Sequence, residues 1–104
     1  MALSIPPFEI VWDSNKALSN VQKHGIPFAL AASVLLDPLA LTQFDAVHSD
    51  DEERWFTLGL ASDGRLMAIT HTHHVIDEET FLVRLISARI ATRHERQQYE
   101  QEPR

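Results

Sequence analysis

The spacing of apolar residues changes along this chain from a helical period to a strand period, and this change limits the fold class most strongly. Between residues 13 and 37, apolar side chains recur every three to four positions, which indicates amphipathic helices. Between residues 39 and 86 they alternate or form short runs separated by turn residues, which indicates strands. A helical block followed by a strand block is typical of an α+β fold.

The first part of the chain predicts one strand and two helices. Residues 8–12 (FEIVW) are β-branched and aromatic, as expected of a short strand. Asp13 is a suitable N-cap for a helix that runs to about His24, and Gly25 is placed to end it in a left-handed turn. A second helix over residues 27–36 opens with proline and is stopped by an Asp-Pro pair.

The second part predicts antiparallel strands and a final helix. Asp63-Gly64 marks a hairpin turn between two of the strands. Ser87 is a candidate cap for a mostly polar helix through about Glu100. We expect one sheet with the helices packed on one of its faces. The predicted strands cover residues 39–44, 54–61, 66–74 and 81–86.

Length and composition indicate one domain in the cytoplasm. The chain has 104 residues and no cysteine, so we expect a single core without a disulfide framework. Residues 1–7 and 101–104 are expected to be flexible. The longest apolar stretch, residues 27–41, is shorter than the roughly 20 residues that cross a bilayer, and it contains Asp37. The first residues carry no basic leader segment, so we expect no contact with a membrane.

Charge is distributed unevenly along the chain. The formal net charge is −6, which argues against non-specific coating of nucleic acid, because that affinity comes mostly from basic residues. Residues 84–104 nevertheless hold five arginines against three glutamates. The planar guanidinium of arginine suits phosphate or carboxylate recognition. The arginines are therefore compatible with two kinds of ligand, a substrate phosphate and an acidic partner protein.

Lys23 and His24 stand together at the end of the first predicted helix. Basic residues at this position interact favourably with the negative end of the helix dipole, which is sufficient as a structural explanation. The functional alternative makes His24 a proton-transfer group, because histidine titrates near neutral pH without special tuning.

Three histidines lie close together at the end of one predicted strand, with His48 some distance earlier. His71 and His73 are two residues apart, hence on one face, where two imidazoles can share a metal ion. His74 follows directly. No third ligand stands at a spacing that demands it, so we expect neither a metal nor another cofactor, and we favour His71 as part of a polar site on the sheet.

Arginines also stand inside or beside the predicted strands. Arg84 interrupts an apolar strand. Two explanations fit its position equally well: an ion pair with a carboxylate on an exposed face of the sheet, or a catalytic role. If Arg84, Arg65 and His71 converge on one face, the arrangement favours phosphoryl transfer without a metal, in which arginines neutralise the phosphorane. RNA supplies its own nucleophile in the 2′-hydroxyl, so no catalytic serine or cysteine is needed.

Three segments resemble the BrnT family, toxins of type II toxin–antitoxin modules. They are FEIVWDSNKALSNVQKHGIPFALAASVLLDPLAL, HSDDEERWFTLGLASDGRLMAITHTH and VRLISARIATRHERQQYE, and together they cover nearly the whole chain. The most specific elements are W-D-x-x-K with K-H-G, D-P-L, H-S-D-x-E-E-R and I-S-A-R-x-A-T-R-x-E-R.

The resemblance implies a RelE-like fold, a strand and two helices followed by antiparallel strands and a C-terminal helix. It also implies a ribonuclease that inhibits translation, takes RNA as substrate and is neutralised by a BrnA-type antitoxin. DNA is contacted only through that antitoxin, and the complex can be oligomeric. We expect cleavage by 2′-hydroxyl attack, leaving a 2′,3′-cyclic phosphate.

The family's motif positions fall here on Lys23, His24, Glu53, Arg54, Arg65, Arg84, Arg89 and Arg93. The roles that follow, and the addition of His71 and Arg96, are our own prediction beyond the motif match. Glu53 or His24 is the expected general base, His71 the expected acid, and Arg65 and Arg84 the expected phosphate stabilisers. The residues expected to bind RNA or the antitoxin are Lys23, Arg54, Arg89, Arg93 and Arg96.

The last segment departs from the family pattern. Family members are typically basic at the positions held here by Ile90, His94, Gln97 and Gln98, which lowers the expected electrostatic affinity for RNA. The alternative function is therefore a weakly active or inactive module that binds an antitoxin or regulator. In a helix from Ser87 onwards, the arginines would share one face and could dock a partner's carboxylates.

Overall fold

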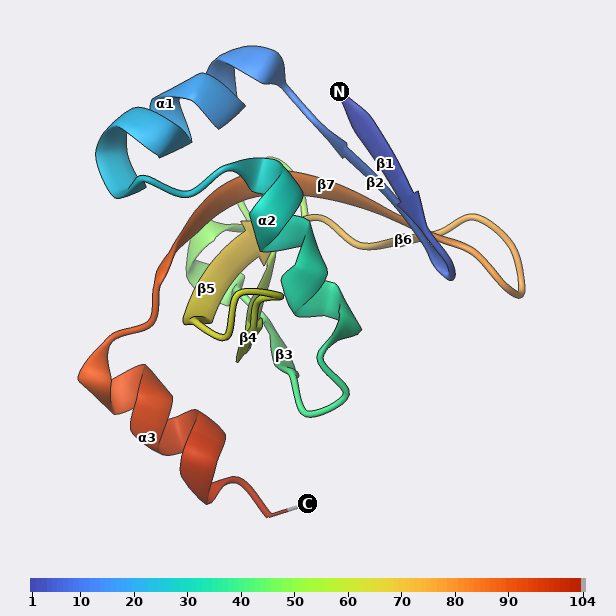
Figure 1. Cartoon of the computed structure of the whole chain (residues 1–104). Coiled ribbons are helices and arrows are strands. Elements are labelled where there is room, and N and C mark those ends of the chain that lie inside the picture. Colours follow the sequence, from blue (N-terminus) through green and yellow to red (C-terminus); the bar gives the residue numbers. More distant parts are fainter. Residues whose placement is uncertain (104) are drawn as a thin grey trace.

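The computed structural model of the chain describes residues 1–103 and combines one mixed sheet with three α-helices in that range (Figure 1). The strands are β1 (Ala2–Ile5), β2 (Phe8–Trp12), β3 (Leu41–Phe44), β4 (Trp55–Leu60), β5 (Leu66–His71), β6 (His74–Val75) and β7 (Phe81–Ile90). The helices are α1 (Ser14–His24), α2 (Phe28–Ala32) and α3 (Arg93–Gln101), with 3-10 turns η1 (Ser33–Leu36) and η2 (Ala46–His48).

The bounds of α1 confirm the caps expected from the sequence. The side chain of Asp13 accepts a hydrogen bond from the backbone N–H of Lys16 at 3.0 Å, which satisfies one of the free donors of the first turn. Gly25 ends the helix in the left-handed region with φ 70°, and its N–H donates to the carbonyl of Val21. A residue with a Cβ would be strained at this φ.

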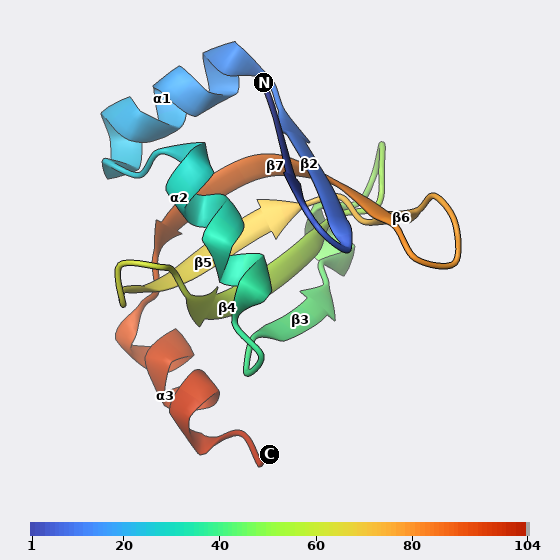
Figure 2. The ribbon, with the colours of Figure 1, turned by 45° about the vertical axis from the view of Figure 1, so that its right-hand side comes forward.

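The sheet joins the beginning of the chain to its end. The strand order is β1-β2-β7-β5-β4-β3, with the short β6 also paired to β7. β2 runs parallel to β7, whereas the other pairs are antiparallel. The sequence predicted hairpins only, so the parallel contact of β2 and β7 is a correction. It places the central strand β7 between the N-terminal hairpin and the β3–β4–β5 meander (Figure 2).

One face of the sheet, here called the covered face, carries the core. Ile10, Ile69 and Val83 are fully buried there and belong to one apolar cluster with Phe28 of α2 and Val34 of η1. Close contact with η1 explains a glycine in β4, because a Cβ on Gly59 would lie 2.9 Å from Cγ1 of Val34.

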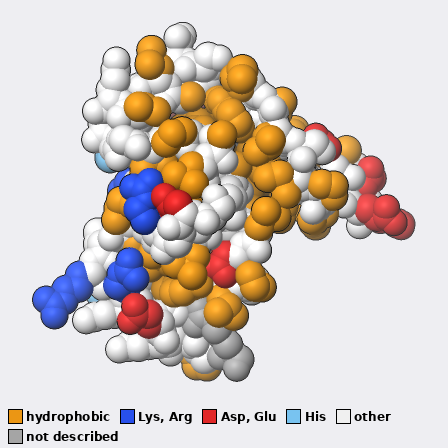
Figure 3. Space-filling view, viewed as in Figure 1, with side chains coloured by type: hydrophobic (Ala, Val, Ile, Leu, Met, Phe, Trp, Pro, Cys, Tyr) orange, Lys and Arg blue, Asp and Glu red, His pale blue; other side chains and the backbone are white. Residues whose placement is uncertain are grey.

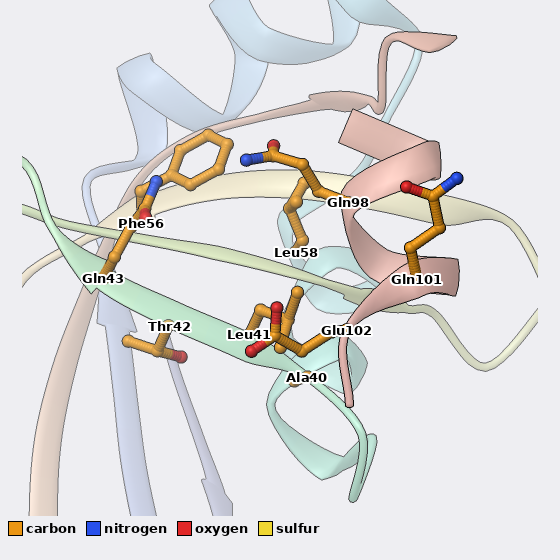
Figure 4. Close-up of a pocket in the computed structure, with 9 residues that line it drawn as sticks. All are labelled: Ala40, Leu41, Thr42, Gln43, Phe56, Leu58, Gln98, Gln101 and Glu102. Carbon is orange, nitrogen blue, oxygen red and sulfur yellow. The ribbon is translucent and has the colours of Figure 1, made fainter. Parts of the chain in front are cut away.

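The third helix lies on the opposite face, here called the α3 face. Successive residues of a strand point to opposite faces, so Phe56 and Leu58 face away from the side on which Gly59 meets η1. Both line a cavity with Gln98 of α3, and Figure 4 shows the strands between α3 and the helices behind them. The expectation that all helices pack on one face is therefore wrong, because α3 covers the second apolar surface of β4.

The final helix begins later than the sequence predicted. β7 continues to Ile90, since residues 87–90 pair with β5. The amide of the buried Asn20 in α1 also donates to the carbonyl of Ala88 at 2.9 Å and accepts from its N–H at 3.0 Å. Thr92, not Ser87, is the N-cap, in a capping box with Glu95.

A β-bulge in β7 changes which side chains share a face. Thr70 pairs with Ser87, but His71 pairs with Leu85, so Ile86 is the extra residue. Without the bulge, residues 84 and 89 would point to opposite faces. With it, Arg84 and Arg89 both lie on the α3 face, while Val83, Leu85 and Ala88 fill the core.

The ends of the chain correct one further expectation. Residues 1–7, expected to be flexible, contain β1, which pairs with β2 in four registered positions. At the other end α3 extends to Gln101, and Arg104 lies outside the described residues. In residues 1–103, no helix has the length and apolar character that a membrane span requires.

Candidate functional site

The α3 face carries an ion pair near the middle of β7. The guanidinium Nη2 of Arg84 donates to Oε1 of Glu52, which stands in the loop before β4. This hydrogen bond is the main cause that lowers the pKa of Glu52, and the positive charges of Arg84 and Arg54 act in the same direction. Glu52 therefore keeps its negative charge at neutral pH, and Arg84 is held with its guanidinium on the open face.

A second ion pair lies further along β7 on the same face. Arg89 donates two hydrogen bonds to the carboxylate of Glu95, at 2.6 and 2.9 Å, and its Cζ lies 5.9 Å from the centre of the Phe56 ring. These hydrogen bonds lower the pKa of Glu95 to about 2 and raise that of Arg89. The Cα atoms of Arg84 and Arg89 are about 15 Å apart at the usual strand rise. The face thus presents two guanidinium groups along one strand.

Two hollows flank α3 on this face. One, of about 450 Å³, lies between α3 and the β3–β4 edge; in Figure 4 Gln98 extends from α3 toward Phe56 and Leu58. The other, of about 610 Å³, lies between the first turns of α3 and the loop that contains η2. Both volumes are of the size that holds a small ligand or a nucleotide.

The β6–β7 loop carries a cluster of acidic side chains. In Figure 3 the basic side chains on the left lie beside acidic ones, whereas the β6–β7 loop at the far right shows acidic side chains without basic neighbours. That loop contains Asp77, Glu78 and Glu79. A polyanion is therefore disfavoured at this loop.

His71 is buried on the covered face, with 1 % of its surface exposed. Its Nδ1 lies 2.8 Å from the carbonyl of Thr72, so Nδ1 carries the proton and donates it, and Nε2 accepts from the hydroxyl of Thr57 at 2.7 Å. Burial lowers the pKa of His71. Both ring nitrogens have partners inside the fold, so this placement does not support the expected role as an acid.

Arg65, Arg84 and His71 do not converge on one face, so the condition for a site built from these three residues is not met. Arg65 lies in the β4–β5 hairpin, where its Nε donates to Asp63 at 2.7 Å. Because Met67 pairs with Ile90, Arg65 stands about 20 Å along the sheet from Arg84. The register of strand pairing decides this separation, and that register cannot be read from the sequence.

The remaining expected residues fall into separate places. Lys23 and His24 are exposed at the end of α1, which packs on the covered face. Arg96 lies on α3, 3.7 Å from Glu100, and Arg93 is the first residue of that helix. Since Arg89 belongs to a strand, the expected stripe of three arginines on one helix face is wrong.

Glu53 and Arg54 stay beside the Arg84–Glu52 pair, just before β4. The backbone of Arg54 donates to Oγ of Ser49 at 3.0 Å and accepts from the N–H of Asp45 at 2.9 Å, which ties the loop to the sheet. Sequence reasoning missed Glu52 and the Glu95 partner of Arg89. The signal for Glu95 was present, since T-x-x-E is a capping-box pattern.

The protein is thus a small α+β domain whose mixed sheet carries two strand-borne arginines on one face, each paired with a carboxylate. The family model of the ribonuclease toxin BrnT of type II toxin–antitoxin systems matches residues 12–95. This match covers most of the chain, which therefore belongs to the BrnT family.

A solved structure supports the fold. The chain is similar to the ribonuclease toxin BrnT of Brucella abortus, whose crystal structure was determined at 1.1 Å resolution. The two share 22% sequence identity with a TM-score of 0.56, and the match covers 81% of this chain and 96% of that one. A comparison with curated proteins gave no match.

Proposed function

We propose that this chain is a ribonuclease toxin that cuts RNA on its α3 face and thereby inhibits translation. The observation that carries the proposal is the pair of guanidinium groups, Arg84 and Arg89, which the bulge in β7 brings to one open face. Membership of the BrnT family supports the ribonuclease activity. The RNA strand runs along β7, with its phosphates on these two arginines.

Arg84 has the geometry of a phosphate ligand. Its guanidinium is planar and permanently charged, and its partner Glu52 is 40% exposed, so a phosphate can approach and share or replace that partner. Charge neutralisation by arginine at the pentacovalent phosphorane needs no metal ion. The nucleophile is the 2′-hydroxyl of the RNA, so the products are a 2′,3′-cyclic phosphate and a 5′-hydroxyl.

Of the two bases expected from the sequence, Glu53 has the more suitable position. It is exposed and directly follows Glu52 in the loop before β4. His24 lies at the end of α1, on the opposite side of the sheet from Arg84. A base has to come within hydrogen-bond reach of the 2′-hydroxyl, which His24 does not do for a strand bound along β7.

Expression of the full chain without an antitoxin tests the proposal. Growth should stop, and cellular RNA should accumulate fragments with 2′,3′-cyclic phosphate ends. Arg84→Ala should relieve the arrest and lower the cleavage rate at least about 100-fold, the usual loss for one transition-state donor. Arg65→Ala is the matched control, because Arg65 is bonded within its hairpin. Equal toxicity of both variants and the native chain would overturn the assignment of the site.

We propose further that a BrnA-type antitoxin inhibits by covering α3 and the adjoining sheet face. Arg93 and Arg96 lie on this helix, and guanidinium groups suit a partner segment that bears carboxylates. Replacing both by glutamate should weaken the complex by at least about tenfold, measured as the Kd for the neighbouring gene's protein. An unchanged Kd with an intact fold would place the antitoxin elsewhere.

A second candidate function is an antitoxin-binding module without nuclease activity. It is favoured by the observation that both arginines of β7 on the α3 face are already paired with carboxylates, while α3 carries Gln97 and Gln98. The RNA assay separates the two functions: this candidate requires that purified protein binds the antitoxin but leaves labelled RNA uncut at every concentration.

A further inference from the structure

The larger hollow on the α3 face contains two histidines that the sequence analysis assigned to no site. This groove of about 610 Å³ lies between the η2 loop and the first turns of α3. Asp45 and His48 line it from the loop, Phe56 forms part of its wall from β4, and His94 and Glu95 line it from the helix. Phe56 and Glu95 both contact Arg89, so the groove adjoins the proposed RNA path.

The orientation of His48 is fixed by its neighbour in the loop. Its Nδ1 lies 2.9 Å from Oδ2 of Asp45, and its backbone N–H donates to Oδ1 of the same carboxylate at 3.3 Å. Asp45 is held in turn by the sheet, because its N–H donates to the carbonyl of Arg54. With Nδ1–H bound to the carboxylate, Nε2 of a neutral His48 carries the lone pair, as a general base requires.

His94 faces the same groove from a fixed helix terminus. It is the second residue of α3, between Thr92 and Glu95, whose reciprocal hydrogen bonds form the capping box. Its side chain is exposed. The charged groups that face the two histidines are Asp45 from the loop and Glu95 from the helix, the latter neutralised by Arg89.

We propose that His48 and His94 are the proton-transfer pair of the RNA cleavage. This inference rests on the proposed ribonuclease function and names the catalytic residues of that face. Nε2 of His48 takes the proton of the 2′-hydroxyl while the 2′-oxygen forms a bond to phosphorus. The bond from phosphorus to the 5′-oxygen breaks, and that oxygen takes a proton from a protonated His94. Exchange with water then resets both imidazoles.

In this proposal His48 acts as the base in place of Glu53 or His24, and His94 acts as the acid in place of His71. His71 is enclosed in the sheet, and His24 lies on the covered side, so neither reaches a strand along β7. His48 and His94 face one groove from two elements, which allows one to act at the 2′-oxygen and the other at the leaving oxygen. Asp45 is a positioning residue, since it touches His48 and not the reacting atoms.

The test uses the full chain and a short labelled oligoribonucleotide, with the cleavage rate measured against pH. The native chain should give a bell-shaped profile, because one imidazole acts neutral and the other protonated. His48→Gln and His94→Gln should each lower the rate at least about 100-fold. Asp45→Asn should lower it less, move the acid limb of the profile, and be partly rescued by Asp45→Glu.

A modified substrate separates the two roles. When sulfur replaces the 5′-bridging oxygen, the leaving group departs without a proton, so cleavage by His94→Gln should recover and that by His48→Gln should not. His74→Gln, at an exposed position of β6, is the matched control and should behave as the native chain.

Each outcome bears on a specific claim. Unchanged rates in His48→Gln, or a failure of the thio substrate to rescue His94→Gln, would overturn the pair while leaving the ribonuclease function standing. Loss of the acid limb in Glu53→Gln, with His48→Gln unaffected, would make Glu53 the base. Absence of cleavage by the native chain would overturn the proposed function itself and this proposal with it.

Discussion

The two faces of the sheet both carry polar side chains, but they use them differently. On the covered face, Thr42, Thr57 and His71 form a chain of hydrogen bonds that ends on the carbonyl of Thr72. On the α3 face, ion pairs such as Arg84–Glu52 are partly open to solvent. The comparison teaches that the partners of a titratable residue, more than its type, decide between a structural and a chemical role.

The largest expected difference between the faces concerns packing. Ile69→Ala should lower the free energy of unfolding by about 2–5 kcal/mol, because it leaves a cavity in the fully buried core. Phe56→Ala, on the α3 face, should cost less, since its ring is partly exposed. Urea unfolding of both variants measures this, and equal losses would show that the two faces are packed alike.

The second difference is in acid sensitivity on the α3 face. The pKa of Glu95 falls from 4.5 to about 2 on folding, mainly through its hydrogen bonds to Arg89. A depressed carboxyl pKa stabilises the fold above pH 4.5, and this stability is lost as the pH falls toward 2. After allowance for the exposed side of Arg89, the loss should be about 2 kcal/mol. The Glu95→Gln variant should not show this acid-dependent loss. The measurement is the free energy of unfolding of the native chain and the variant at pH 7 and at pH 3.

The third difference is the pH range in which a buried group of the covered face changes the stability of the fold. Burial lowers the pKa of His71 below its unfolded value of 6.5. The unfolded chain therefore binds this proton more readily, so stability should fall as the pH drops below 6.5. His71→Leu should remove that slope and cost about 1–2 kcal/mol at pH 7.5, because Thr57 and Thr72 lose their partner. Retention of the slope in this variant, as in His74→Gln, would contradict the assignment.

The smallest expected effect lies outside both faces. Arg65→Ala removes an exposed ion pair with Asp63 in the β4–β5 hairpin, and such pairs contribute little. The unfolding midpoint and the RNA cleavage rate should match those of the native chain. A strong loss of cleavage would show that RNA extends to the hairpin and would enlarge the site beyond β7.

The local elements of the fold could be predicted because their signals are local. Asp13 and Gly25 define the ends of α1, and Asp63-Gly64 defines the hairpin, as found in the structure. The predicted end of β7 was wrong because the signals that decide it come from distant residues. Ser87 looks like a helix cap, but pairing with Thr70 and the hydrogen bonds from Asn20 to Ala88 favour a strand.

The candidate site was predicted in part. Arg84 and Arg54 were named from the sequence, and both surround Glu52 in the structure. Glu52 itself was missed, because the adjacent carboxylates of the loop are alike in sequence and only the fold brings one of them to Arg84. His48 and His94 were missed as a pair for the same reason, since 45 intervening residues separate them and no spacing rule connects them.

By itself, the sequence determined the α+β class, the caps of α1, the hairpin turn and membership of a toxin family, because these depend on neighbouring residues or on motifs along the chain. Only the tertiary structure decided that β2 lies parallel to β7, that α3 takes the second face, and that His71 is enclosed. It also decided that a single bulged residue, Ile86, turns Arg84 and Arg89 to the same side. The physical reason is that strand pairing and bulges are set by contacts between distant segments, and one residue of register moves a side chain to the opposite face.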